Sequence, residues 1–419
     1  MTPLPRWADV VLLPLLNVTL AFLVGGLIVL SVGQNPLQAV GIMLYGAFGY
    51  GSGFGYTLYY TTDFIFAGLA VSLAYHAGLF NIGPEGQAYV GGLGVILIGL
   101  ALNGMHWALV FPLMIICGAM FGAAWAFIPG YLQVRRGSHV VITTIMFNFI
   151  AVSMMGFIIS RILKPEGVNS DESAPLDAIT RVPQLRGFIE LFRNSPVNLT
   201  FFLAIAALFF VYWLIWRTKF GYSVRALGNN PVAAKYAGIS NQKMIMIIMA
   251  LAGAFAAMVA VNNVGGVQGR LILNFVNGAG FVGIAVAFMG KGHPIGVGLS
   301  ALLFGMLYQG GQELAFQMPG ITREMIVTIQ ALVILFTGAM GDMMRGPLSR
   351  ILGQSGSEPP SPAPNMKPKT KKSAPEPSAD SPVDPAGIVV AQGSNITINQ
   401  TNVFNGTNVR GGSDRAEDK

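Results

Sequence analysis

The chain has 419 residues, of which 53% are hydrophobic and only 10% are charged, and its mean hydropathy is +0.60. Soluble domains carry roughly 25% charged residues, so this composition excludes a water-soluble globular enzyme and predicts an integral membrane protein. The net charge of +7 is no signal for nucleic-acid binding, because the basic residues lie between apolar runs and in the tail.

Apolar runs close to the ~20 residues that cross a bilayer recur along most of the chain. They cover about 9–33, 59–80, 86–103, 107–129, 139–162, 198–217, 243–263 and 324–343. The apolar stretch 277–310 is interrupted by Gly-Lys-Gly-His-Pro at 290–294, which predicts two short spans or one broken helix. The predicted fold is therefore all-α, a polytopic transmembrane bundle of about ten spans with a broken or re-entrant segment.

Basic residues between the runs predict how the chain crosses the membrane. Arg135 and Arg136 follow the fourth run, and the loop 217–243 holds five basic residues and no acidic one. With ten crossings, these loops and both termini face the cytoplasm. The loop 163–197 carries charges of both signs, and we place it outside.

The last part of the chain differs in composition from the apolar runs. Residues 354–385 are rich in Pro, Ser and Lys, which is typical of disorder, whereas 394–404 alternates as a strand does. We therefore divide the chain into a transmembrane permease domain, 1–350, and a mostly disordered cytoplasmic tail, 351–419. We expect the tail to be dispensable for transport, although its strand-like part offers a pairing segment to a cytoplasmic partner.

Several kinds of catalytic and cofactor site have no match in this sequence. It has no Gly-x-x-x-x-Gly-Lys-Ser/Thr phosphate loop, so we expect it not to hydrolyse ATP alone. Its four histidines are scattered and its single cysteine, Cys117, lies in an apolar run, so we expect no metal site. The absence of a paired catalytic constellation argues against a membrane-embedded enzyme.

The first informative segment is Gly-Leu-Phe-Asn-Ile-Gly-Pro-Glu-Gly-Gln at 78–87, between two apolar runs. Asn81, Glu85 and Gln87 are polar, and the Gly and Pro residues interrupt a helix. Irregular polar backbone at membrane depth is tolerated only inside protein or beside water. Two interpretations stay open: a break that faces a translocation pathway, or a short cytoplasmic turn. Under the first, we place Asn81, Glu85, Gln87 and Asn148, from the run 139–162, on the pathway, with Glu85 held by hydrogen bonds.

The second informative segment is 225–239, in the most basic loop. Asn230 can cap a short helix that begins at Pro231, and Gly238 can end it. Small residues at 233, 234 and 237 would let this helix lie in a groove of another protein. We favour such docking over an ordinary basic loop, and the residues that we assign to it are Arg225, Gly228, Pro231, Ala233, Ala234 and Gly238.

These two segments and the string 284–296 together resemble the permease family of ATP-binding cassette (ABC) importers for simple sugars, nucleosides and branched-chain amino acids. The string at 78–87 is most similar to the nucleoside and simple-sugar branch. The segment 225–239 resembles the family's coupling-helix region, although Val232 stands where many of these permeases have an acidic or polar residue. The resemblance covers about residues 10–345.

The resemblance implies a transport subunit of a bacterial inner membrane that moves a nucleoside or simple sugar by alternating access. Its implied partners are a second permease subunit, identical or related, an ABC ATPase that holds the ATP and Mg²⁺, and an extracytoplasmic substrate-binding protein. The alternatives are an importer of branched-chain amino acids from the same family and an ion-coupled secondary transporter. The latter would need membrane-embedded carboxylates, for which Glu85 and Asp63 are the candidates.

Overall fold

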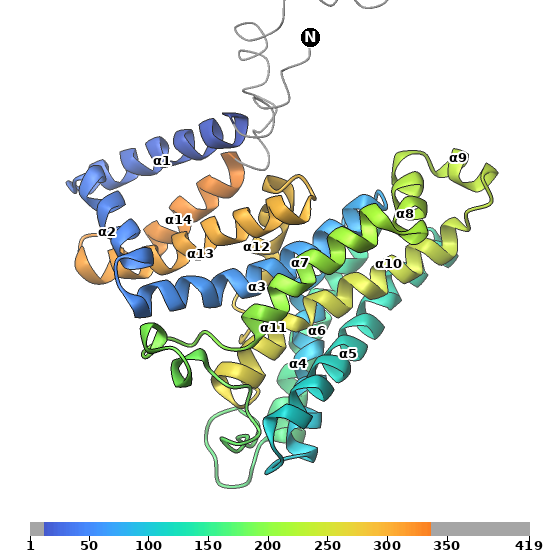
Figure 1. Ribbon diagram of the computed structural model, residues 1–419, viewed down its shortest axis with the longest axis horizontal. Helices are drawn as coiled ribbons and strands as arrows, with labels where there is room; N and C mark the ends of the chain where they lie inside the picture. Colours follow the sequence, from blue (N-terminus) through green and yellow to red (C-terminus); the bar gives the residue numbers. More distant parts are fainter. Residues whose placement is uncertain (1–11, 337–419) are drawn as a thin grey trace, which may run out of the picture. The chain divides into compact units, whose positions relative to one another are not determined.

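The computed structural model describes residues 12–336, and every regular element in this range is a helix (Figure 1). The α-helices of the first half are α1 (Leu13–Ser31), α2 (Pro36–Phe48), α3 (Gly51–His76), α4 (Pro84–Ala101), α5 (Trp107–Arg136) and α6 (Val140–Ile158). Those of the second half are α7 (Thr200–Arg217), α8 (Lys219–Asn229), α9 (Pro231–Tyr236), α10 (Asn241–Ala256), α11 (Met258–Ala260), α12 (Ala279–Met289), α13 (Pro294–Gln317) and α14 (Arg323–Ile334). Short 3₁₀ or π segments are η2 (Ile159–Leu163), η3 (Leu185–Gly187), η4 (Glu190–Phe192) and η5 (Val261–Gln268).

The all-α fold is confirmed, but the count of ten spans is not. Five helices are long and apolar enough to cross a membrane, namely Gly51–His76, Trp107–Arg136, Val140–Leu163, Thr200–Arg217 and Asn241–Gln268. The pair α1 and α2 meets the same criterion only together, with a bend of 115° between them. Other predicted runs form helices that are short or partly polar: α12 has 11 residues, and α13 contains Gln309, Gln312 and Glu313.

The break within 277–310 is confirmed. Helix α12 ends at Met289 and α13 begins at Pro294. Between them Lys291 and Gly292 have positive φ angles of 51° and 67°, a conformation that stops an α-helix. The segment is therefore two helices that meet at a sharp turn.

Helix α2 and the first part of α3 were not among the predicted runs, because 41–55 is rich in glycine. Packing accounts for their stability. A Cβ atom at Gly53 would overlap the carbonyl oxygen of Gly46, and one at Gly46 would lie 2.7 Å from Cγ of Glu313. These glycines lower helix propensity but allow backbones to approach closely, as in membrane helix pairs.

The basic loop and the loop at 164–199 lie at opposite ends of the helices. Gly228 in α8 packs against the carbonyl oxygen of His76, at the end of α3. At the other end, the amide of Asp177 donates to Oδ1 of Asn103, after α4 (2.8 Å). This arrangement agrees with placing the two loops on opposite sides of a membrane. The termini and the tail 351–419 lie outside the described residues, as do the expectations about them.

Candidate functional site

The polar part of the segment 78–87 is buried inside the protein, whereas Gly78 at its start is exposed. Asn81 is fully buried and Gln87 is 1% exposed. Nε2 of Gln87 donates to Oδ1 of Asn81 (3.1 Å), and Nδ2 of Asn81 donates to Oε1 of Gln87 (3.3 Å). Oδ1 of Asn81 also accepts from the amide of Gly83 (2.9 Å). Within this segment, Asn81 and Gln87 thus bond to each other, and Asn81 also satisfies one backbone N–H group.

Glu85 joins this segment to the start of α12. It is only 6% exposed, and its two carboxylate oxygens accept from the amides of Gly278 (3.0 Å) and Gly280 (2.9 Å). These donors belong to the first turn of α12, where N–H groups lack helical partners and the helix dipole favours negative charge. A Cβ at Gly280 would overlap the backbone nitrogen of Glu85, so the two chains are in direct contact.

Asn148 completes the support of the break from α6. Its Oδ1 accepts from the amide of Gly86 (2.9 Å), and its Nδ2 donates to the carbonyl of Ile82 (2.8 Å). The structure therefore brings Asn81, Glu85, Gln87 and Asn148 to one buried segment. None of these four residues lines a cavity described below, so their placement on the pathway stays a prediction.

The segment 225–239, for which docking to another protein is predicted, has the predicted local structure. Oδ1 of Asn230 accepts from the amides of Val232 and Ala233 (both 3.0 Å), α9 starts at Pro231, and Gly238 follows it with φ +81°. Sequence alone could not assign the faces of so short a helix. Ala234 is buried, whereas Val232 and Tyr236 are 64% and 90% exposed.

The segment 225–239 also contacts the segment 78–87, which contains the buried helix break. Gly228 lies at the end of α8, and a Cβ there would overlap the carbonyl oxygen of His76 and lie 3.0 Å from the amide of Gly78. Arg225, one turn earlier, is half-buried. The contact makes a continuous path of protein from α9 through Gly228 and 78–87 to Glu85 and α12.

A second buried polar cluster, which no local sequence pattern predicted, joins α3 to η5. Oδ1 of Asp63 accepts from Nδ2 of Asn262 (2.9 Å) and Nδ2 of Asn263 (3.0 Å). Oδ1 of Asn262 accepts from Nδ2 of Asn198 (2.8 Å), and the Tyr59 hydroxyl donates to Asn263. The available signals were a lone Asp and an Asn-Asn pair within apolar runs. π-Helical segments such as η5 often occur at functional sites.

This cluster borders a cavity of about 230 Å³ between α3, α13 and the segment 268–279. Its polar and aromatic lining residues are Tyr59, Tyr60, Asp63, Phe64, Asn263, Gln268, Asn274, Phe275, Asn277 and Tyr308. A second cavity of about 590 Å³ shares Asn277 and Tyr308 with the first and extends between α13 and α14. Together they form a hollow that is lined by both polar and aromatic side chains.

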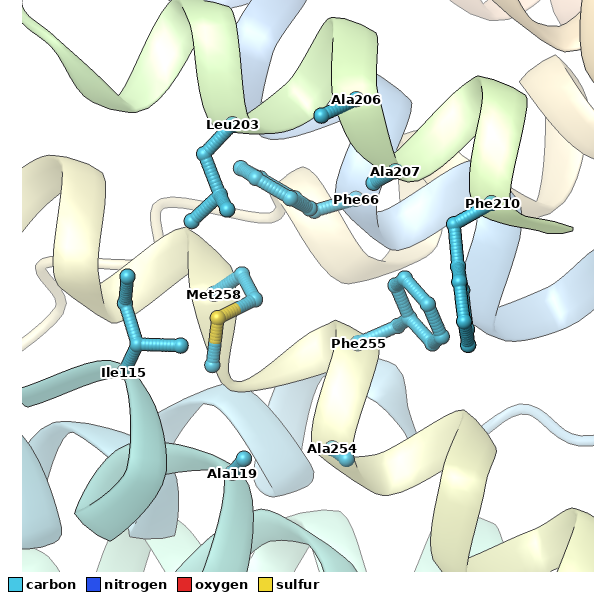
Figure 2. Close-up of a pocket in the computed structure, with 10 residues that line it drawn as sticks. All are labelled: Phe66, Ile115, Ala119, Leu203, Ala206, Ala207, Phe210, Ala254, Phe255 and Met258. Atoms are coloured by element: carbon cyan, nitrogen blue, oxygen red, sulfur yellow. The ribbon is translucent and has the colours of Figure 1, made fainter. Parts of the chain in front are cut away.

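A third pocket, of about 280 Å³, is apolar and distinct from this site (Figure 2). Side chains from α3, α5, α7, α10 and α11 surround it. Figure 2 labels them as Phe66, Ile115, Ala119, Leu203, Ala206, Ala207, Phe210, Ala254, Phe255 and Met258. With no polar side chain in this lining, the pocket has no means of orienting a polar solute.

An ion-coupled transporter would use the buried carboxylates of Asp63 and Glu85. Asp63 and Glu85 are both occupied by amide or backbone N–H donors from the protein itself. Within residues 12–336 no group of three or more His, Cys, Asp or Glu side chains could hold a metal ion.

Comparison with known proteins identifies the family. A family model described as the branched-chain amino acid transport system permease component matches residues 53–338. The guanosine ABC transporter permease protein of Bacillus subtilis (strain 168) is 35% identical over 331 residues, which cover 78% of this chain and 93% of that protein. No solved structure matches the chain.

Two further relatives are also permease proteins of ABC transporters. The nucleoside ABC transporter permease protein of Lactococcus lactis subsp. cremoris is 33% identical, with 78% of this chain and 90% of that protein covered. The glucose ABC transporter permease protein of Haloferax volcanii is 32% identical, with 77% and 86% covered. These matches do not favour an ion-coupled secondary transporter. The chain belongs to the family of branched-chain amino acid transport system permease components, and it is a membrane-embedded permease subunit of an ABC transport system and not an enzyme.

Proposed function

We propose that this permease subunit imports a nucleoside, with simple sugars as the second candidate class. The observation that carries the proposal is the similarity over more than three quarters of the chain to permeases named for guanosine and for nucleosides. The permease named for glucose is the reason to retain sugars. The polar, aromatic cavity beside Asp63 supports an uncharged, hydrogen-bonding solute.

The proposed cycle is alternating access driven by a separate ATPase that binds ATP and Mg²⁺. A second permease subunit and an extracytoplasmic binding protein complete the system, in the inner membrane of a bacterium. The exposed face of α9 is the proposed contact for the ATPase. A shift of α9 would reach the cavity wall through Gly228, the segment 78–87 and the bonds from Glu85 to Gly278 and Gly280. In this proposal, Asn81, Gln87 and Asn148 keep the pathway wall rigid.

Uptake by cells tests the substrate class. Cells that lack their own nucleoside importers should accumulate radiolabelled guanosine when the chain is expressed with its transport system. Excess unlabelled adenosine should compete, whereas excess glucose or leucine should not. Competition by glucose alone would indicate that the substrate is a sugar and not a nucleoside. Competition by leucine alone would favour a branched-chain amino acid as the substrate.

Tyr236→Ala should weaken ATPase docking by roughly 30-fold, because exposed aromatic anchors at interfaces often contribute about 2 kcal/mol or more. Tyr236 is 90% exposed on α9, so its removal leaves the fold of this chain intact. The measurement is the amount of ATPase that copurifies with the tagged chain. The matched control is Phe188→Ala, which removes a 71% exposed ring from the opposite end of the helices. Equal ATPase yields from both variants would rule out the α9 contact.

A further inference from the structure

We propose that the paired cavities between α3, α13, α14 and the segment 268–279 form a binding site for the nucleoside itself, with the base against Tyr308 and Tyr60. The inference rests on the proposed function and adds the location of the solute and the chemistry that selects it. It also predicts that phosphorylated nucleosides and free amino acids are excluded.

One wall of the site is aromatic. The ring centroids of Tyr60 and Tyr308 are 5.7 Å apart, those of Phe64 and Tyr308 are 4.9 Å apart, and those of Tyr59 and Tyr60 are 5.1 Å apart. Tyr308 lines both cavities and is half-buried. Flat heterocyclic bases stack on such rings, and every base can do so through its π face.

A second part of the lining, here called the amide wall, consists of asparagine and glutamine side chains. Asn263, Gln268, Asn274 and Asn277 line the smaller cavity. Oε1 of Gln268 is shielded from solvent and has no hydrogen-bond partner within residues 12–336. A buried acceptor of this kind calls for a donor. An N–H group of a base or a ribose hydroxyl would supply it.

The backbone of this wall is held in an unusual conformation. Asn274 and Asn277 have positive φ angles of 60° and 49°, which asparagine tolerates better than most residues. Glu85 anchors the next turn through Gly278 and Gly280. Backbone conformations that are rarely populated, and that neighbouring residues hold in place, often occur where a ligand must be oriented.

The charge of the lining excludes other solutes. The described residues that line the two cavities include no Lys, Arg or His. The one acidic residue is Asp63, whose carboxylate is already bonded to Asn262 and Asn263. A phosphate group would find no cation, and the two charges of a free amino acid would find no partners, at a high desolvation cost. An uncharged solute with a flat ring and polar edges fits.

The test uses the assembled permease and ATPase complex in nanodiscs, without the binding protein, and radiolabelled guanosine as the probe. Tyr308→Leu should weaken binding roughly ten-fold or more, the loss typical of removing an aromatic ring from a stacked base. Gln268→Met, which keeps the length of the side chain but removes its acceptor, should weaken binding roughly three- to ten-fold. The matched control is Phe316→Leu, also on α13 but 83% exposed and outside both cavities.

The wild-type complex provides a readout that does not depend on any variant. Photolabelling with 8-azidoadenosine should modify peptides that contain 59–64, 268–279 or 308, and guanosine but not guanosine monophosphate or glucose should protect them. Labelling confined to other peptides, or equal protection by glucose, would overturn the inference. If the wild type imports guanosine but both variants bind it normally, the site is wrong and the proposed function stands. If the wild type neither binds nor imports nucleosides, the proposed function fails as well.

Discussion

Glu85→Gln should reduce the rate of solute import about ten-fold or more without lowering the amount of protein in the membrane. Both carboxylate oxygens of Glu85 accept backbone N–H groups, from Gly278 and Gly280. A glutamine has one acceptor, so its NH₂ group would face an N–H donor and leave it unpaired. An unpaired buried donor costs about 1–3 kcal/mol, and here it would loosen the wall at 274–280.

The control for this variant is Glu190→Gln. The Glu190 side chain is 87% exposed and pairs with Arg193, at the opposite end of the helices from α9. The Glu190→Gln variant loses the same charge as Glu85→Gln and should import the solute at the wild-type rate. Normal import by Glu85→Gln would show that the charge and the second hydrogen bond are both dispensable.

Gly228→Ala should also reduce import about ten-fold or more, but for a steric reason. A Cβ at this position would overlap the carbonyl oxygen of His76, and backbone atoms cannot move aside as a flexible side chain can. Alanine is the better helix former, so a loss of function could not arise from helix propensity. The exposed face of α9 would be unchanged. We therefore expect the ATPase to copurify normally while import fails.

This separation of docking from import distinguishes Gly228→Ala from Tyr236→Ala. The matched control is Gly41→Ala in α2, where an added Cβ meets no other atom within 4 Å. Wild-type import by Gly228→Ala would contradict the path from α9 through Gly228 to the cavity wall. Loss of the ATPase in the same variant would show that Gly228 supports docking instead.

Local signals in the sequence were enough to predict several parts of the site. The short helix at 231–236 follows from Asn230 as its cap, Pro231 at its first position and Gly238 after it, all of which act within a few residues. The buried bonds of Glu85 follow from the cost of a bare carboxylate at membrane depth. The helix break at 290–293 follows from Gly290 and Gly292 within it and from Pro294 directly after it.

Other features depend on contacts between distant residues and could not be predicted. Asp63 forms hydrogen bonds with Asn262 and Asn263, which lie about 200 positions away in the chain. These asparagines belong to a π-helical segment that no sequence periodicity predicts. Helix α2 contains glycines that lower its helix propensity, and it is stabilised by the close contacts that these glycines allow. The inward direction of Ala234 depends on what α9 packs against. The count of ten spans is not confirmed within residues 12–336, because helices such as α12 are shorter than a bilayer crossing requires.

The most direct test of the account is solute uptake by proteoliposomes that contain this chain, its partner permease, the ATPase and the binding protein. We expect radiolabelled guanosine to accumulate only when ATP and Mg²⁺ are supplied to the ATPase side. A non-hydrolysable ATP analogue, or a proton or sodium gradient alone, should give no accumulation. Uptake by this chain alone, driven by an ion gradient in the absence of ATP, would contradict it.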